Sequence, residues 1–304
     1  MKFTPTRLLS ARILPALALS TAMLAAPAYA QDSRTVDVTF LLVNDIYAID
    51  NTSDQGGFGR LAAVVNAERA ANENLIYAVA GDVLSPSLLS SFDQGEHIIE
   101  LFNMTPPDIF VPGNHEFDFG EDVFRTRMGE AQFPLLAANM RNEDRSQLEG
   151  FADTMMMDVD GFMIGVIGLT ADDSPEKSSP GTIQFMNTLE TGLAEADRLR
   201  EEGADMIVVV AHANIAVDNA MYATGEFDLI LTGDDHDLRL MYDGRTALLE
   251  SGEEAEYVTA IDVTANIREG DRRRVGLDFA FRPMSTLNME PDATVQARLD
   301  ELNE

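Results

Sequence analysis

Short apolar runs, each followed by a polar cluster, recur along the chain. The runs cover residues 36–43, 75–80, 109–111, 206–211 and 227–231. Runs of this length that end at Gly, Pro or polar residues are typical of buried strands. Segments of helical composition lie between them, at 60–71, 94–103, 119–130 and 188–202. The alternation predicts one large α/β domain or two small ones.

The same pattern assigns the remaining segments. We expect a strand at 135–138 that ends in Asn139, a strand pair at 151–168 that turns at Asp160-Gly161, and a loop at 171–181. Three further strands at 247–249, 257–263 and 275–281 are spaced as in an antiparallel edge. Met155, Met156 and Met157 are interpreted as core packing. His97, between Glu96 and Glu100 in the helix 94–103, is interpreted as a solvated surface residue.

Side chains that can bind a metal or transfer a proton follow all five apolar runs. The polar residues at these ends are Asn44, Asp45, Tyr47, Asp82, Asn114, His115, Glu116, Asp118, His212 and the run 234–237. Three of the four histidines lie among them. Polar residues follow most strands, because loops are polar. Since the carboxyl ends of parallel strands meet at one edge of a sheet, however, five such ends together predict a metal or catalytic centre.

Composition restricts the metal. The chain has no cysteine, so any metal must be held by oxygen and nitrogen ligands. Mixed Asp, Asn and His ligation suits Mn²⁺, Fe²⁺ or Zn²⁺ better than Ca²⁺. Asp82 stands alone after its strand and is placed to bridge two cations, which together could activate water and clamp a phosphoryl oxygen.

The first 30 residues have the features of a secretory signal peptide. Lys2, Arg7 and Arg12 precede an apolar stretch that is too short to span a bilayer, and a small-x-small cleavage signal ends at Ala30. We therefore expect cleavage after residue 30, export to the periplasm or the extracellular medium, and no membrane association of the mature form.

The mature chain is strongly acidic. Residues 31–304 contain 18 basic and 52 acidic side chains, a net charge of about −34. Such a surface repels nucleic acid and anionic lipid, so neither is expected as a partner. It would also repel a phosphate substrate, so a phosphate site would need local positive charge, which bound divalent metals would supply.

The polar blocks resemble the signature series of the metallophosphoesterase superfamily, in particular the bacterial 5'-nucleotidase/UDP-sugar hydrolase branch. The resemblance runs from about residue 36 to 249 and is carried by Asn44-Asp45, Gly81-Asp82, Gly113-Asn114-His115-Glu116-Phe117-Asp118, Asn139, His212 and Gly233-Asp234-Asp235-His236. It implies a four-layer αββα sandwich, with two mixed sheets flanked by helices, and a two-metal site that hydrolyses phosphate esters.

The resemblance also implies roles for individual residues. Asp45 and His236 would bind the first metal, Asn114 and His212 the second, and Asp82 would bridge both. His115 would assist the leaving group, with Asp118 as its orienting partner. The substrate would contact Asn114 and His115, and Asn139 is a further candidate.

Two positions depart from the family pattern. The family usually has Asp-x-His at the first strand end, where this chain has Asp45-Ile46-Tyr47, and Gly-His-x-His at the last, where it has Gly233-Asp234-Asp235-His236. Tyr47 could ligate metal through its phenolate or only donate a hydrogen bond near the centre. Asp234 could supply an oxygen ligand in place of an imidazole.

The expected organisation is a catalytic domain at 31–285, followed at 286–304 by a helix that resembles the linker to a nucleoside-binding domain. The leading hypothesis is an exported hydrolase of phosphate monoesters, above all 5'-nucleotides, that uses two divalent ions. The alternatives are a phosphodiesterase acting on cyclic nucleotides or UDP-sugars, and a catalytically inactive metal-binding remnant. The sequence does not predict the oligomeric state.

Overall fold

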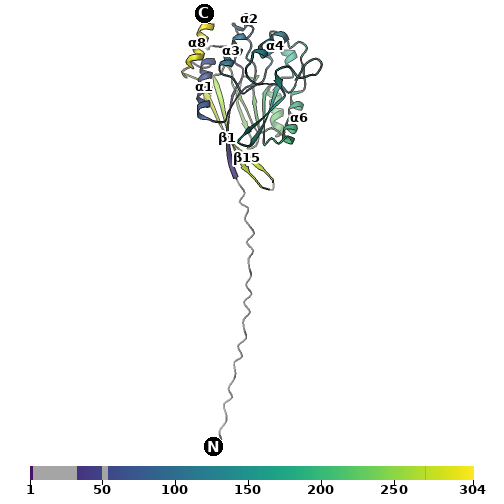
Figure 1. The fold of residues 1–304 in the computed structure, drawn as a ribbon, viewed down its shortest axis with the longest axis vertical. Coiled ribbons are helices and arrows are strands. Elements are labelled where there is room, and N and C mark those ends of the chain that lie inside the picture. The colour runs from purple at the N-terminus through teal and green to yellow at the C-terminus, as the bar shows by residue number, and fades with distance from the viewer. Residues whose placement is uncertain (3–32, 50–53, 271) are drawn as a thin grey trace.

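Two mixed β-sheets lie face to face in the computed structural model, and helices cover the outer face of each (Figure 1). The structure describes residues 1–2, 33–49, 54–270 and 272–304. All but the first two residues of the predicted signal peptide lie outside these ranges. The predicted four-layer αββα sandwich is therefore confirmed for the described part of the chain.

The first sheet has seven strands. Their order is β15 (Arg274–Ser285), β14 (Tyr257–Arg268), β1 (Ser33–Val43), β2 (Leu75–Val79), β3 (Ile109–Phe110), β4 (Leu135–Leu136) and β6 (Phe151–Ala152). Strands β1 to β4 and β6 run parallel, whereas β14 is antiparallel to both β1 and β15.

The second sheet has six strands. Their order is β12 (Leu238–Tyr242), β13 (Ala247–Ser251), β11 (Leu229–Thr232), β10 (Met206–His212), β8 (Phe162–Thr170) and β7 (Thr154–Val159). The four inner strands are parallel, and β12 and β7 form antiparallel edges. A separate pair joins β5 (Met140–Arg141) to β9 (Gln184–Phe185).

Helices occupy the segments between the strands. They are α1 (Phe58–Ala71), α2 (Ser90–Asp93), α3 (Glu96–Met104), the 3-10 turn η1 (His115–Phe117), α4 (Glu121–Glu130), α5 (Ser174–Lys177), α6 (Thr188–Glu201), α7 (Ile215–Thr224) and α8 (Ala293–Leu302). Asp292 caps α8 by accepting hydrogen bonds from the Thr294 and Val295 N–H groups. None of the helices in the described ranges is both long enough and apolar enough to cross a bilayer.

Alternating side chains of β1 show how the layers form. Phe40 and Leu42 join the apolar cluster between the two sheets, together with Val208 of β10. Leu41 and Val43 point the other way, into the cluster beneath α1, α3, α4 and α8. A third cluster lies between the second sheet and helices α6 and α7. Strand β1 is thus buried on both faces from Val38 to Val43, as its continuous apolar run predicted.

Two sequence interpretations are wrong. His97 is 1% exposed, and its Nδ1 hydrogen-bonds Asp93 at 2.7 Å. It lies four residues before the buried Leu101, so it shares the inward face of α3. The strand at 247–249 is also not an antiparallel edge, since β13 runs parallel to β11. The unpredicted strand β12 reverses the chain before β13 and forms the edge instead.

Candidate metal and catalytic site

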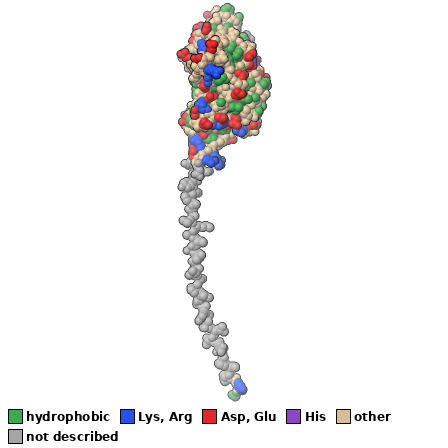
Figure 2. All heavy atoms as spheres, turned by 90° about the vertical axis from the view of Figure 1, so that its right-hand side faces the viewer, with side chains coloured by type: hydrophobic (Ala, Val, Ile, Leu, Met, Phe, Trp, Pro, Cys, Tyr) green, Lys and Arg blue, Asp and Glu red, His purple; other side chains and the backbone are tan. Residues whose placement is uncertain are grey.

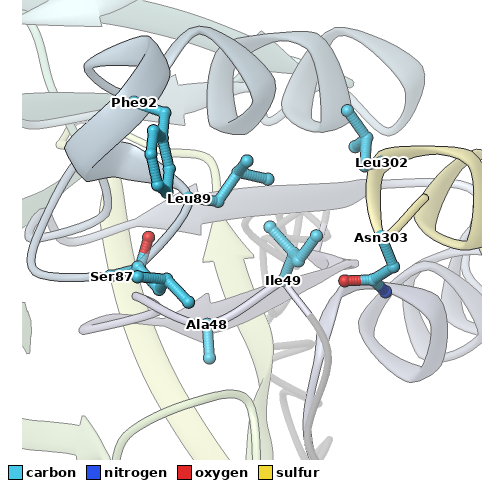
Figure 3. A pocket seen from close by; sticks show the side chains of 8 residues that line it. Ala48, Ile49, Ser87, Leu89, Phe92, Leu302 and Asn303 are labelled. Carbon is cyan, nitrogen blue, oxygen red and sulfur yellow. The ribbon is translucent and has the colours of Figure 1, made fainter.

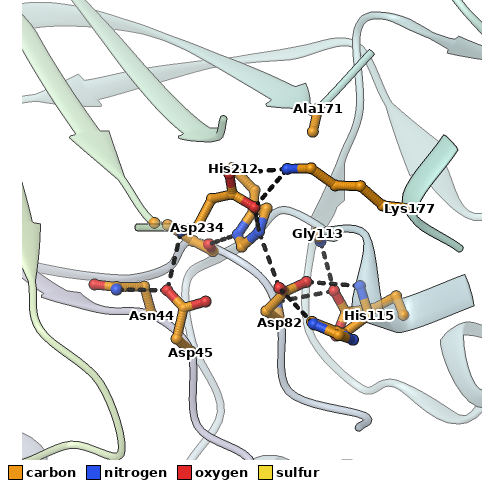
Figure 4. A network of polar contacts seen from close by, with 12 residues as sticks. Asn44, Asp45, Asp82, Gly113, His115, Ala171, Lys177, His212 and Asp234 are labelled. Carbon is orange, nitrogen blue, oxygen red and sulfur yellow. Dashed lines mark hydrogen bonds and ion pairs between the residues drawn. The ribbon is translucent and has the colours of Figure 1, made fainter. Parts of the chain in front are cut away.

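The parallel strands of both sheets end at one edge of the sandwich, and the predicted site residues gather there (Figure 4). Asp45 and Asp82 follow β1 and β2 of the first sheet, whereas His212 ends β10 and Asp234 follows β11 of the second. The site therefore lies where the two sheets meet, at the place where α/β sheets bind ligands.

Asp45, Asp82 and His212 form the centre of this group. A ligand atom from each lies within 4.8 Å of the others, and all three side chains are buried. Asp82 Oδ2 is 3.1 Å from His212 Nε2, and Asp82 Oδ1 accepts the backbone N–H of His115. Two carboxylates and an imidazole at this spacing are a donor set suited to a divalent metal.

The ring of His212 is oriented as in a metal ligand. Its Nδ1 lies 2.8 Å from the carbonyl oxygen of Ala80, so Nδ1 carries the proton and donates it. Nε2 is fully buried and faces two carboxylate oxygens, Asp82 Oδ2 at 3.1 Å and Asp234 Oδ1 at 3.4 Å, without a well-directed hydrogen bond to either. Burial opposes protonation, but Asp82 and Asp234 together raise the pKa of His212 well above its usual value in the metal-free protein. A metal cation bound at Nε2 would take the place of the proton that these two carboxylates favour there.

Four of the predicted ligands have an unusual backbone conformation. The φ angle is 52° at Asp45, 57° at Asp82, 103° at Asp234 and 62° at His236. Positive φ values are uncommon outside glycine, and they cluster at functional sites where surrounding structure holds them. The strand ends are therefore bent to direct these side chains into the site.

Two glycines permit the close approach of the loops. A Cβ atom on Gly113 would lie 2.1 Å from Asp82 Oδ1, and one on Gly233 would lie 2.8 Å from Asp45 Oδ2. Since real Cβ atoms do not approach other atoms so closely, any larger residue at these positions would displace a carboxylate.

Tyr47 and His236 lie on the Asp45 side. The Tyr47 hydroxyl is 3.0 Å from Asp45 Oδ1 and 2.9 Å from His236 Nε2. Burial, followed by the charge of Asp45, raises the pKa of the Tyr47 phenol. The hydrogen bond to Asp45 raises the pKa of His236 to about 9. The Tyr47 hydroxyl thus donates a hydrogen bond to one predicted metal ligand and lies against a second.

The side chains of Asp234 and Asn114 lie beside His212 and His115. Asp234 Oδ1 is 3.4 Å from His212 Nε2. Asn114 stands between Asp234 and His115, with one end of its amide group 3.0 Å from Asp234 Oδ1 and the other 3.2 Å from the His115 backbone nitrogen. Lys177, which the sequence analysis did not select, forms an ion pair with Asp234.

His115 and Asp118 form a pair at the entrance to the site. His115 Nδ1 is 2.6 Å from Asp118 Oδ2, and the His115 side chain is 33% exposed. Its Nε2 faces Asp82 Oδ2 at 3.9 Å. Asp118 also accepts hydrogen bonds from Ser85 and Ser178, which fix its carboxylate. Substrate can thus reach one ring nitrogen while Asp118 orients the other.

Asn139 is not brought into this group. It is fully buried, its Nδ2 donates to the carbonyl oxygens of Thr170 and Met186, and its Oδ1 accepts from Thr170 N. These bonds tie β4 to β8 and give Asn139 a structural role at the junction of the two sheets.

Three buried or half-buried glutamates hold the site loops by their backbone. Glu116 accepts the N–H groups of Asp82, Val83, Leu84 and Gly113. Glu254 accepts those of Tyr47 and Ala48, and Glu250 those of Asp235 and Asp237. These roles are not predictable from the sequence, because nothing in the local pattern distinguishes a loop-binding carboxylate from a solvated one.

An apolar hollow of about 320 Å³ lies beside the first two site loops (Figure 3). Ala48 and Ile49, directly after Tyr47, form one wall, and the segment 87–89 forms another. Leu88 and Phe92 at this hollow are 80% and 79% exposed, which is unusual for large apolar side chains.

The family model described as calcineurin-like phosphoesterase matches residues 38–238, which include every residue of the converging group. The chain belongs to the calcineurin-like phosphoesterase family. Among curated relatives, mouse 5'-nucleotidase is 27% identical over 74% of this chain and 42% of its own length. A probable 5'-nucleotidase of Treponema pallidum is 31% identical over 60% of this chain and 31% of its own length. The chain thus spans less than half of these two relatives.

Solved structures show the same fold. The 5'-nucleotidase precursor of Thermus thermophilus superposes with a TM-score of 0.75 at 22% identity, over 88% of this chain and 58% of that one. The calcineurin-like phosphoesterase YfkN of Bacillus subtilis gives 0.74 at 20% identity, over 89% and 97%. Family membership identifies this phosphoesterase domain as a phosphoric ester hydrolase, and the family uses divalent metals that the oxygen and nitrogen donors here fit.

Mn²⁺ is expected to stabilise this phosphoesterase domain by about 2.7 kcal/mol at a concentration one hundred times its Kd, because only the folded state assembles the cluster. Thermal denaturation with and without the ion measures the gain. Asp82→Asn should lose most of the Mn²⁺-dependent shift, whereas Asp197→Asn, whose side chain is 80% exposed, should keep it. An equal shift in both variants would show that the ion binds elsewhere.

The hydrogen bond to Asp118 raises the pKa of His115 above its usual value of 6.5. The paired imidazolium therefore stabilises the fold fully below pH 6.5, and this contribution is lost as the pH rises through the raised pKa. In Asp118→Asn the midpoint of His115 should fall. An NMR titration of the four histidines in the metal-free protein measures it, and the midpoint of His97, which lies on α3, should stay constant.

Proposed function

We propose that the protein is an exported, metal-dependent hydrolase of phosphate monoesters and that 5'-nucleotides are its main substrates. The observation that carries the proposal is the position of the His115–Asp118 pair beside the buried cluster of Asp45, Asp82 and His212. A proton donor within reach of a metal-ligand cluster is the arrangement that ester hydrolysis needs.

In this proposal Asp45, Asp82, Asn114, His212, Asp234 and His236 hold two divalent ions of Mn, Fe or Zn. When bound, such ions activate water and balance the charge that develops on the phosphoryl group. His115 protonates the leaving-group oxygen through Nε2. Asp118 accepts the Nδ1–H of His115 and stabilises the imidazolium, which is the form that carries the proton given from Nε2.

The choice of nucleotides rests on two observations. The curated relatives reported above are named 5'-nucleotidases. The apolar hollow beside the Tyr47 and Ser85 loops offers a surface for the non-phosphate part of a substrate. Export rests on the sequence features of residues 1–30, and the division into a catalytic domain at 31–285 and a terminal helix at 286–304 is part of the same proposal.

Phosphate release from 5'-AMP by the purified protein tests this function. Bound metal is removed by chelation, and Mn²⁺, Fe²⁺ or Zn²⁺ is added back in separate reactions. Metal-dependent release of phosphate supports the proposal. Faster hydrolysis of a cyclic nucleotide or a UDP-sugar than of AMP would assign the protein as a phosphodiesterase, and no turnover of any ester with any metal would assign it as an inactive metal-binding protein.

A further inference from the structure

Lysine is almost absent from this chain. The sequence contains two lysines, Lys2 and Lys177, but nineteen arginines. Lys2 belongs to the predicted signal peptide, so Lys177 is the single lysine of the chain beyond it. It lies at the end of α5, in the segment between β8 and β9.

The ammonium group of Lys177 points into the metal-ligand cluster (Figure 4). Its Nζ lies 2.9 Å from Asp234 Oδ1 and 3.0 Å from Asp234 Oδ2. The next carboxylate oxygen, on Asp173, is 3.4 Å away, which is long for a hydrogen bond. An ammonium group has three N–H donors; Asp234 takes two, and the third has only this longer ion pair with Asp173, which a ligand can replace. The side chain is 33% exposed, so a ligand can reach it.

The segment that carries Lys177 contacts both the metal-ligand cluster and the His115–Asp118 pair. Lys177 contacts Asp234 on the side of the second sheet. The next residue, Ser178, donates a hydrogen bond of 2.7 Å to Asp118 Oδ1, and Asp118 holds His115. Lys177 is therefore fixed between the metal-ligand cluster and the proton-donating pair, and the phosphoryl group of a bound ester has to lie between these same two groups.

The positive charge of Lys177 stands out because the rest of the chain is strongly acidic. The whole chain has a formal net charge of −31, and Figure 2 shows Asp and Glu side chains spread over the face seen there. Among the ion pairs of the described residues, Lys177 supplies the one Lys or Arg partner of a predicted metal ligand. Arg239, which follows the loop of Asp234 and His236, pairs with Asp218 instead. Apart from the histidines, Lys177 is thus the cation of the described residues that is held against a predicted metal ligand, in otherwise acidic surroundings.

We propose that Lys177 binds the phosphoryl group of the substrate through its third N–H donor while Asp234 holds the ammonium in place. The inference rests on the proposed function, since it assigns a contact within that same site. Lys177 is then a substrate-binding residue that adds to the charge of the metals. The alternative role, which the experiment below has to exclude, is that Lys177 only neutralises Asp234 and does not contact the substrate.

Calorimetric titration of inorganic phosphate into the Mn²⁺-saturated protein separates the two roles without any turnover. Lys177→Met should weaken phosphate binding by about tenfold or more, because a charge-assisted hydrogen bond is lost. Lys177→Arg should recover most of the affinity. The matched control is Arg273→Met, which removes one cation of similar exposure that pairs with Asp205. Asp205 precedes β10, whereas His212 ends it, so this control lies at the opposite end of the same strand.

The rarity of lysine allows a second readout. Reductive methylation of the wild-type protein can modify Lys177 as the sole ε-amine beyond residue 2, and peptide mass analysis measures its extent. Phosphate together with Mn²⁺ should slow methylation at Lys177 more than Mn²⁺ alone. Unchanged phosphate affinity in Lys177→Met at saturating Mn²⁺, or no protection by phosphate, would overturn the inference.

These measurements also distinguish the inference from the proposed function. Phosphate binding that depends on Lys177 in a protein that hydrolyses no ester would contradict only the proposed function. Hydrolysis with full phosphate affinity in Lys177→Met would contradict only the role of Lys177.

Discussion

Replacing His115 with alanine is expected to lower kcat for phosphate release from 5'-AMP by about 10²–10⁴-fold. The ribose 5'-oxygen is a poor leaving group and needs a proton as its bond to phosphorus breaks. His115 is placed to give that proton, because Asp118 binds its Nδ1 and Nε2 faces the cluster at 3.9 Å from Asp82. Initial rates of the wild type and the variant at saturating Mn²⁺ measure the loss.

A second substrate sharpens this test. An aryl phosphate whose leaving group is already acidic needs little protonation, so His115→Ala should lose much less activity with it than with AMP. Mn²⁺ affinity should stay unchanged, because His115 is outside the predicted ligand set. Equal losses with both substrates, accompanied by weaker Mn²⁺ binding, would mean that His115 supports the metal centre and does not donate a proton.

The convergence of the site could be predicted from the sequence because it depends on a topological rule. Asp45, Asp82 and His212 lie 37 to 167 residues apart, yet each lies one or two positions after an apolar run. Parallel strands place such ends at one edge of a sheet, which brings Asp45 and Asp82 together in the first sheet. His212 belongs to the second sheet, and the sandwich implied by the family resemblance was needed to bring it to them. The order of the strands was not needed.

Burial and the contacts between loops could not be predicted in this way. His97 has polar neighbours in sequence but faces the core, because its position on the helix and not its neighbours sets its surroundings. Strand β12 was missed since its apolar residues do not mark its covered face: Leu238 and Leu240 are exposed, whereas Arg239 between them is half-buried. Lys177 could have been found from its rarity alone, as the single lysine after residue 2.

The glutamates that hold the loops belong to the same class of missed feature. Glu116, Glu250 and Glu254 each accept N–H groups from a loop that carries predicted ligands. A carboxylate has two oxygens with several lone pairs, so a single side chain can fix consecutive N–H groups that no strand or helix would satisfy. The bent backbone at Asp45, Asp82 and Asp234 is thus held by side chains, which explains how a strained site persists in a stable sandwich.

Glu116 is the strongest of these supports, and Glu116→Ala is expected to destabilise the protein by at least about 4 kcal/mol. The substitution leaves four buried N–H groups without an acceptor, at about 1–3 kcal/mol each. For a domain of this size the melting temperature should fall by roughly 8 °C or more. Denaturant unfolding of the metal-free protein measures the change in the free energy of unfolding, so loss of metal binding does not contribute.

Two variants make the result specific. Glu116→Gln keeps the shape and one acceptor oxygen, so its loss should lie between that of the alanine variant and the wild type. Glu130→Ala removes a carboxylate that is 42% exposed and pairs with Arg127, and it should change stability by less than about 1 kcal/mol. If Glu116→Ala were as stable as Glu130→Ala, the Asp82 loop would keep its conformation without the buried carboxylate. The bend at Asp82 would then have to come from the close approach of Gly81 and Gly113 alone.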